Sequence, residues 1–286
     1  MAATQAEAKS GGLPAAELQR LTGIAKRVRE KILHVTEKSG GGHLGGSFSQ
    51  TDILVALYHK YMRVDPKNPK WEERDRFVLS KGHGGIGHAT LLGDMGFFEE
   101  VKLEKFNKTE SIFGMHLDRH KVPGVDASTG SLAHGFAIGL GFAHGARLTD
   151  RKWHTYIVIS DGELHEGTTW EAFLSGAQFK ITNATVFVDF NKLTIDGFTA
   201  QIMNVEPIDK KIEAFGWYVQ RIDGHDFNQI CEAIENAAAE TERPSCIICD
   251  TVKGKGVDFM ENQPKWHYGG LDNELAAKAL AALRKG

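Results

Sequence analysis

Three features are scarce in this chain of 286 residues: cysteine, an excess of charge of either sign, and long apolar runs. The N-terminal stretch MAATQAEAKSGGLP has no apolar core of signal-peptide length, and no run approaches the roughly 20 apolar residues that a spanning helix needs. Lys and Arg total 34 against 37 Asp and Glu, so the net charge of −3 gives no electrostatic reason to expect a nucleic acid or an anionic membrane as a partner. We therefore expect a cytoplasmic protein with no nucleic acid or membrane partner.

The three cysteines are odd in number and too few for a disulfide framework. Cys246 and Cys249 form a C-x-x-C pair, a spacing that also occurs in redox and zinc sites. The surrounding SCIICDTV is typical of a strand, in which residues three apart point to opposite faces. We therefore expect both thiols to pack in the core.

The hydrophobic content of 41% is enough for a full core, and we expect one domain over residues 1–286, with 1–14 as a flexible N-terminus. Helical apolar spacing covers 15–38, and GGGHLGG then predicts a loop. Further helices are predicted at 49–62, 85–107, 132–149, 168–180, 207–215, 226–240 and 272–286, and strands in DRFVLS and at 155–160, 185–189, 217–222 and 245–251. This alternation predicts an α/β fold, a doubly wound and mostly parallel sheet with helices on both faces, which binds ligands at the carboxyl ends of its strands.

Oxygen-bearing groups follow two of these strands. Asp161 ends the strand 155–160, while Asn191 and Leu193 follow the strand 185–189. A carboxylate, an amide oxygen and a backbone carbonyl are the hard ligands that Mg²⁺ prefers. Two ordinary strand ends are the alternative interpretation, because Asp is common there and Asp-Gly is a turn signal.

Five stretches carry a family resemblance. SDGELHEGTTWEA, followed about 30 residues later by VFVDFNKLTIDG, resembles the thiamine diphosphate motif. KSGGGHLGGSFSQTDILVALY, RFVLSKGHG, HLDRHKVPGVDASTGSLAHG and DTVKGKGVDFMENQPKWH resemble successive blocks of the N-terminal half of transketolase, in the expected order. The chain thus resembles the transketolase family, and the fold implied is its thiamine-diphosphate-binding fold, the pyrophosphate domain.

The resemblance implies a cofactor site. Asp161, Asn191 and the carbonyl of Leu193 would hold Mg²⁺, for which Ca²⁺ or Mn²⁺ can substitute, against the diphosphate of thiamine diphosphate. His83 would hydrogen-bond a diphosphate oxygen. The other cofactor-binding residues implied are Gly130, Ser131, Leu132, Gly162, Glu163, Asn191 and His267. The glycines also fit ordinary turn geometry.

The resemblance further implies catalytic residues. His43 and His116 would hold the hydroxyls of the donor sugar, and His43 with His267 would take the proton whose loss breaks a C–C bond, a task that suits imidazole. Glu166 and Glu171 resemble an acidic pair that links two active sites across a subunit interface, although Glu171 also fits a helix surface. A zinc site at His116 and His120 is a weaker alternative, because no helix is indicated there.

The implied reaction moves a two-carbon ketol group from a ketose to an aldose, with the cofactor as electron sink. The family's second half is not found in this chain, so we expect the C-terminal transketolase subunit to be a separate chain, in an α₂β₂ assembly. The substrates implied are sugars or sugar phosphates. Delivery of the two-carbon unit to a carrier protein, or a non-catalytic regulatory subunit, are alternatives.

Several positions depart from the family pattern. SDG replaces the usual GDG, MHL the usual GHP, and His134 a glutamine. Leu117 and His120 also differ from the common residues, from which we expect a donor pocket of altered shape or charge. A modified substrate, such as a branched or sulfonated ketose, is therefore considered alongside the ordinary pentose phosphates.

Overall fold

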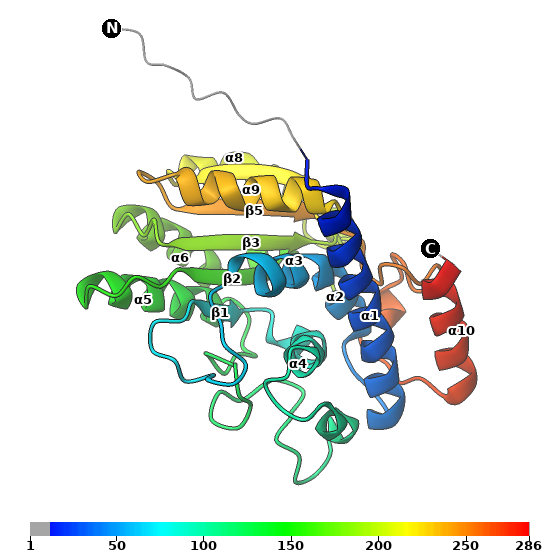
Figure 1. Ribbon diagram of the computed structural model, residues 1–286. Helices are drawn as coiled ribbons and strands as arrows, with labels where there is room; N and C mark the ends of the chain where they lie inside the picture. Colours follow the sequence, from blue (N-terminus) through cyan, green and yellow to red (C-terminus); the bar gives the residue numbers. More distant parts are fainter. Residues whose placement is uncertain (1–11, 286) are drawn as a thin grey trace, which may run out of the picture.

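The structure is a computed structural model and describes residues 12–285. Figure 1 shows strands stacked in one sheet between helices. The α-helices are α1 (Ala15–Ser39), α2 (Leu44–Ser49), α3 (Thr51–Ala56), α4 (Gly85–Asp94), α5 (His134–Leu148), α6 (Gly167–Gln178), α7 (Thr199–Ile202), α8 (Ile208–Ala214), α9 (Phe227–Ala239) and α10 (Asn273–Lys285). The strands are β1 (Arg76–Leu79), β2 (Thr155–Ser160), β3 (Ala184–Phe190), β4 (Tyr218–Asp223) and β5 (Ser245–Asp250). Short segments of other helix types are η1 (Leu57–Tyr61), η2 (Gly82–Gly84), η3 (Glu100–Lys105), η4 (Asp161–His165) and η5 (Pro264–Trp266).

The five strands form one parallel sheet in the order β1-β2-β3-β5-β4. The register pairs Ser160 with Asp189 and Asp189 with Cys249, so β2, β3 and β5 end at the same edge. The predicted α/β fold is confirmed, and its sheet is parallel throughout these strands. Parallel strands bring the segments after β2 and β3 together at one edge, as a ligand site there requires.

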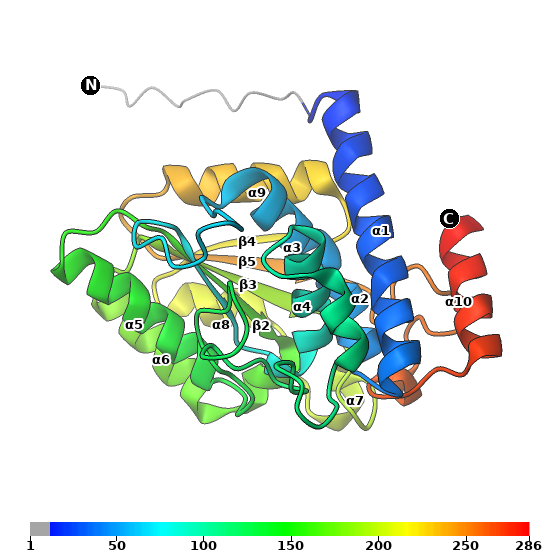
Figure 2. The ribbon, with the colours of Figure 1, turned by 60° about the horizontal axis from the view of Figure 1, so that its bottom comes forward.

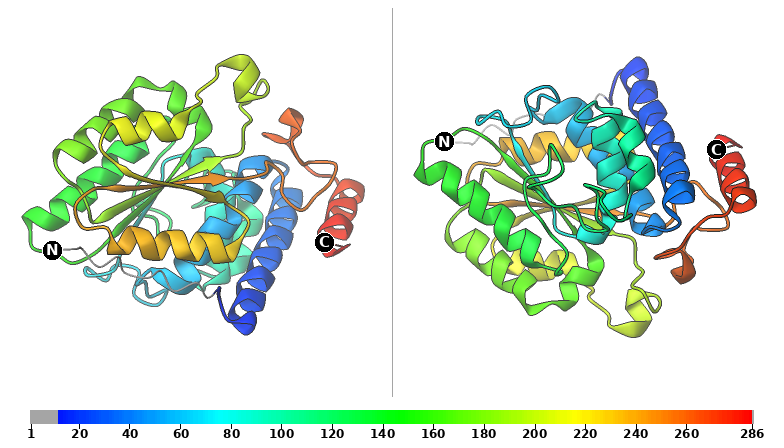
Figure 3. Two further views of the ribbon diagram at one scale, coloured as in Figure 1. Left: turned by 90° about the horizontal axis from the view of Figure 1, so that it is seen from above. Right: turned by 90° about the horizontal axis from the view of Figure 1, so that it is seen from below.

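Helices cover both faces of the sheet, because its inner strands are apolar on both sides. Within β3, Phe187 packs in the cluster on the side of α1, α3 and α9, whereas Val186 and Val188 pack in the cluster with α5, α6 and α8. Figure 3 shows these two layers on opposite sides of the strands. Cys249 belongs to the first cluster and Cys246 to the second, both fully buried and free, so the prediction that they pack in the core is confirmed.

Two local predictions were wrong, and one predicted helix starts two residues later than expected. The predicted loop GGGHLGG contains the start of α2, which forms despite its glycines because all its residues are buried. The predicted helix 85–107 ends at Asp94, since Gly96 adopts a left-handed φ of 86° there. The helix predicted from 132 begins at His134, because Ala133 has a φ of 69°.

Most of the predicted flexible N-terminus, residues 1–11, lies outside the described residues. Leu13 belongs to the described part, and its N–H donates to Asn228 Oδ1 of α9 at 2.8 Å. Between residues 12 and 285, no helix combines the length and the apolar character needed to cross a membrane.

A buried histidine on α4 makes folding stability depend on pH. His88 is 2% exposed, its Nε2 lies 2.8 Å from the Tyr58 hydroxyl, and burial lowers its pKa to about 3. The folded state therefore keeps this imidazole neutral, while the unfolded chain takes up a proton below about pH 6.5. Stability is thus lost as the pH falls from about 6.5 toward 3.

The variant His88→Gln keeps a polar partner for Tyr58 but cannot titrate. We expect its loss of unfolding free energy between pH 8 and pH 5 to be about 2 kcal/mol smaller than in the wild type, as measured by urea unfolding. His34→Gln, on an exposed part of α1, is the control and should behave as the wild type. An unchanged pH dependence in His88→Gln would contradict this account.

Candidate active site at the carboxyl edge of the sheet

A cavity of about 350 Å³ opens at the carboxyl edge of the sheet. It is lined by His43, Gly46, His83, His116, Gly130, Leu132, Ser160, Asp161, Gly162, His165, Glu166, Asn191, Leu193, Thr194, Ile195, Asp196, Lys253 and His267. In Figure 1 the arrowhead of β3 points toward α2, which borders this edge. The structure therefore brings most of the predicted site residues together from segments far apart in the sequence.

The three predicted metal ligands meet through backbone contacts. Asp161 accepts hydrogen bonds from the N–H groups of Gly162 at 2.9 Å and Lys192 at 2.6 Å. Lys192 lies between the other two ligands, and its left-handed φ of 67° makes the turn tight. The Asn191 Oδ1 accepts from the Leu193 N–H at 3.2 Å. Asp161 is thereby fixed against the Asn191–Leu193 turn.

The charged groups around Asp161 are compatible with a metal cation that is bound together with an anion. Asp161 is 1% exposed, and burial, followed by the negative charge of Asp189, raises its pKa to about 7. Carboxylate, amide and carbonyl oxygens each keep a lone pair beyond those already used, and they match the donor set of Mg²⁺. The described residues contain no cluster of three or more His, Cys, Asp or Glu that could hold a metal. A metal here would therefore need ligands of the mixed kind found at Asp161, Asn191 and Leu193.

Two buried lysines lie beside this turn. Lys81 is fully buried; its Nζ donates to the Gly46 carbonyl at 2.9 Å and pairs with Asp189. Lys253, 2% exposed, donates to the carbonyls of Leu193 at 3.1 Å and Thr194 at 3.0 Å. Burial lowers the pKa of Lys253 to about 8, which keeps most of its charge at neutral pH. A diphosphate entering the cavity would thus meet Lys253, which lines it, while the Lys81–Asp189 pair lies buried beside the cavity.

Glycines on α2 allow this close approach. A Cβ on Gly46 would lie 3.2 Å from Lys81 Nζ, and one on Gly45 would lie 2.7 Å from Lys253 Cγ. The second distance is shorter than real Cβ contacts allow, so a side chain there would push the lysine away. The glycine-rich sequence around His43 is thus used to pack the helix against the two lysines.

Three histidines gather over the cavity. The ring centroids of His43, His83 and His267 lie 5.2 to 5.4 Å apart in pairs. His116 approaches from the loop before α5, where a Cβ on Gly130 would lie 3.2 Å from His116 Cγ. Burial lowers the pKa of His83 well below its usual value, and the nearby Lys81 adds to this effect. The His83 imidazole is therefore neutral at physiological pH.

The hydrogen bonds distinguish His43 from His267. Lys253 Nζ lies 2.9 Å from His267 Nδ1, and an ammonium can only donate, so this nitrogen accepts and the ring proton is on Nε2. His43 Nδ1 is buried with no hydrogen-bond partner among the described residues. Burial, with the charge of neighbouring groups, lowers the pKa to about 4 at His43 and about 3 at His267. His267 thus presents an N–H, whereas no hydrogen bond among the described residues fixes the tautomer of His43.

Two predicted cofactor-binding residues do not line the cavity. Ser131 is exposed beside it. Glu163 is fully buried, and its carboxylate accepts hydrogen bonds from the Ser80 hydroxyl, the Ala133 N–H at 2.9 Å and the Ser160 N–H at 2.8 Å. Glu163 therefore joins the ends of β1 and β2 to the start of α5, and its side chain positions these segments.

The two members of the predicted acidic pair lie in different surroundings. Glu166 lines the cavity, and Glu171 lies exposed on α6, which packs beside α5 in Figure 2.

The expectation that Leu117 and His120 shape the donor pocket is not supported, because neither lines the cavity. Leu117 is 5% exposed in the core, and His120 lines a separate cavity. The loop turns away after His116, so residues four apart do not share a site.

The model of the family described as transketolase, thiamine diphosphate binding domain, matches residues 22–284. This chain belongs to the transketolase family. A 6-deoxy-6-sulfo-D-fructose transketolase subunit of Clostridium sp. strain MSTE9 is 40% identical over 261 residues, covering 91% of this chain and 95% of that one. One subunit of the apulose-4-phosphate transketolase of Actinobacillus succinogenes is 38% identical over 260 residues, covering 90% of this chain and 94% of that one.

Longer transketolases match over a part of their length. Human transketolase is 31% identical over 271 residues, which cover 93% of this chain and 42% of that one. The crystal structure of Campylobacter jejuni transketolase superposes with a TM-score of 0.87 at 31% identity, covering 93% of this chain and 43% of that one. The chain thus spans less than half the length of these transketolases.

Sequence reasoning missed Lys81, Lys253 and Asp189, although each lies in or beside a stretch that resembles transketolase. A charged residue inside the apolar strand VFVDF was the available signal for Asp189, since a fully buried carboxylate requires partners. Lys81 and Lys253 each stand next to a glycine, in SKGHG and VKGKG, and nothing in those stretches separates a buried lysine from a solvated one.

The buried ion pair of Lys81 and Asp189 supplies a test of stability. Asp189→Asn leaves the Lys81 ammonium buried without its charged partner, which should lower the unfolding free energy by about 3 kcal/mol. The double variant Lys81→Met, Asp189→Asn should recover part of this loss, because no unpaired charge remains.

Urea unfolding measures all these variants. Asp150→Asn removes a carboxylate that is 91% exposed and paired with Lys152, and it should change stability by less than about 0.5 kcal/mol. A loss in Asp189→Asn no larger than in Asp150→Asn would contradict the role assigned to the buried pair.

Proposed function

We propose that this chain is the N-terminal subunit of a thiamine-diphosphate- and Mg²⁺-dependent transketolase. It transfers a two-carbon ketol group from a ketose to an aldose and is active only with a separate C-terminal subunit, in an α₂β₂ assembly. The observation that carries this proposal is the meeting of His43, His83 and His267 over the turn that joins Asp161 to Asn191 and Leu193. A regulatory subunit without catalysis would not need buried lysines beside such a turn.

The chain's own residues divide the work of binding. Asp161, Asn191 and the Leu193 carbonyl would hold Mg²⁺, and Lys253, which lines the cavity, supplies positive charge toward a diphosphate. A dication and a diphosphate bring charges of opposite sign into a site that already holds two carboxylates and two ammonium groups, so the buried region stays near neutral. Thiamine diphosphate, when bound, supplies the electron sink for C–C cleavage.

Proton transfer and donor binding fall to the histidines. His43 lines the cavity and accepts a proton from the donor sugar, and the negative charge of a bound diphosphate raises its basicity. His267 donates its Nε2–H to a substrate oxygen while Lys253 holds its other nitrogen. His116 holds a donor hydroxyl at the outer side of the cavity, and Glu166 takes part in the contact between active sites.

Exposed apolar side chains support a partner subunit. Ile195, Phe198, Ile202 and Met203 are 65%, 40%, 52% and 61% exposed, and Ile195 lines the mouth of the cavity. Apolar groups gathered at one place on a surface are typical of a protein interface. The relatives from Clostridium sp. and Actinobacillus succinogenes are both described as transketolase subunits. A second chain covering this mouth would exclude water from the site.

The donor is proposed to be a phosphorylated or otherwise modified ketose. The relative from Clostridium sp. is named for a sulfonated fructose, and the one from Actinobacillus succinogenes for a sugar phosphate. We propose a cytoplasmic location, which agrees with the three free, buried cysteines.

The test is ketose-to-aldose transfer by this chain alone and with a co-expressed candidate partner, with thiamine diphosphate and Mg²⁺ present. Fructose 6-phosphate and 6-deoxy-6-sulfofructose are offered as donors. We expect transfer only in the mixture, because the chain alone supplies the diphosphate half of the site. His43→Ala should lower kcat by about 100-fold or more, as expected for loss of a general base.

His34→Ala, which removes an exposed histidine of α1, is the matched control and should leave the rate unchanged. Robust transfer by this chain alone, or full activity of His43→Ala in the mixture, would contradict the proposal. Transfer to a carrier protein with no transfer to any aldose would replace the proposed acceptor.

A further inference from the structure

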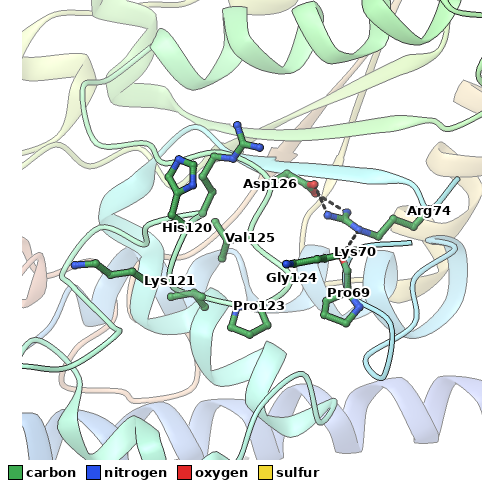
Figure 4. Close-up of a pocket in the computed structure, with 11 residues that line it drawn as sticks. Pro69, Lys70, Arg74, His120, Lys121, Pro123, Gly124, Val125 and Asp126 are labelled. Carbon is green, nitrogen blue, oxygen red and sulfur yellow. Dashed lines mark hydrogen bonds and ion pairs between the residues drawn. The ribbon is translucent and has the colours of Figure 1, made fainter. Parts of the chain in front are cut away.

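A second cavity, of about 480 Å³, lies beyond the sheet edge formed by β1. One wall is the segment before β1, with Pro69, Lys70 and Arg74, and the other is the loop 119–126. Figure 4 shows His120 and Lys121 on one side of it and Arg74, Lys70 and Pro69 on the other. It shares no lining residue with the active-site cavity. Its size is that of a site for a small molecule.

The acidic residue in this cavity is already neutralised. Asp126, 8% exposed, accepts two hydrogen bonds from the Arg74 guanidinium at 2.6 and 2.9 Å and one from the Phe77 N–H at 2.9 Å. Arg74 also donates to the Pro69 carbonyl at 2.8 Å, which fixes the corner that carries Lys70. Arg74 and Asp126 form the floor of this cavity, where they are held in place and balance each other's charge.

The cations around that floor form no ion pair within the described chain. Lys70, Arg119 and Lys121 are exposed, and no carboxylate of residues 12–285 lies within 4.0 Å of their charged nitrogens. His120 adds a further nitrogen to the same wall. A guanidinium and two ammonium groups around one cavity match the oxygens of a phosphate or sulfonate group, which they bind through charge-assisted hydrogen bonds.

The loop that lines this cavity begins and ends in the active site. His116 and Gly130 both line the active-site cavity and lie against each other, whereas residues 119–126 between them line the second cavity. Ser128 Oγ closes the loop, since it accepts from the Arg119 N–H at 3.0 Å and donates to Asp118 at 3.2 Å. A ligand that binds Arg119 and Lys121 would therefore also restrain the loop that presents His116.

We propose that this cavity is a second anion site, which takes the phosphate or sulfonate group of a small molecule and thereby orders the loop 116–130. The ligand binds between Lys70 on one wall and Arg119 and Lys121 on the other, with Arg74 and Asp126 as the fixed floor. The site goes beyond the proposed transferase function, and its test does not depend on that activity.

The test is a titration of the full chain with inorganic phosphate, with sodium chloride in the reference at matched ionic strength. Binding is measured by calorimetry and by amide hydrogen exchange. We expect slower exchange in the loop 118–128 with phosphate than with chloride. The triple variant Lys70→Gln, Arg119→Gln, Lys121→Gln should lose this protection and at least about tenfold in affinity at this site. Exchange near residues 43–46 and 191–194 reports separately on phosphate in the active-site cavity.

The matched control is Lys102→Gln, Lys105→Gln, Lys108→Gln, which removes the same charge from exposed positions nearby. It should keep both the affinity and the protection. Methyl phosphate and methanesulfonate in place of phosphate distinguish an ester from a sulfonate as the preferred group. Equal protection of the loop in both triple variants, or an equal loss in both, would overturn the proposal. Unfolding without phosphate checks that each variant is folded.

Discussion

The carboxylate of Asp189 is the interaction on which the site depends. It is fully buried at the end of β3, and it accepts hydrogen bonds from Lys81, from Ser49 at 2.6 Å and from Thr251 at 2.5 Å. These partners follow β1, end α2 and follow β5, so one charge joins four segments at the carboxyl edge. A charge removed from water in this way is stable only if its partners stay in place. A change that displaces these partners and alters the cavity would therefore also lower the stability of the fold.

The same carboxylate also sets the electrostatics of its neighbours. Its negative charge adds to burial in raising the pKa of Asp161 to about 7, whereas Lys81 and Lys253 act in the opposite sense. Those lysines in turn help keep His83 and His267 neutral. The site combines anionic oxygens below with neutral imidazoles above. This division suits a metal-bound anion at the floor and proton transfer at the top.

Part of this arrangement could be predicted from the sequence. The apolar runs and their spacing were sufficient for the strands, and oxygen-bearing residues after β2 and β3 meet wherever those strands are parallel neighbours. Helix α2 was missed because LGGSFS has poor helix propensity, and only burial on every side stabilises it. The path of the loop after His116 depends on the contact between Asp126 and the start of β1, which no local pattern reveals. Buried Lys81 was hidden for the same reason, since its partner lies 108 residues away.

The central claim is that this chain's own residues hold the metal-bound diphosphate of the cofactor. Calorimetric titration of the full chain with thiamine diphosphate, with and without Mg²⁺, tests it most directly. The account predicts binding that requires Mg²⁺ and is lost in Asp161→Asn, but is retained in Asp196→Asn, which removes the same charge from the rim of the same cavity. Binding that is equally strong without Mg²⁺ or in Asp161→Asn, or no binding by the wild-type chain, would contradict it.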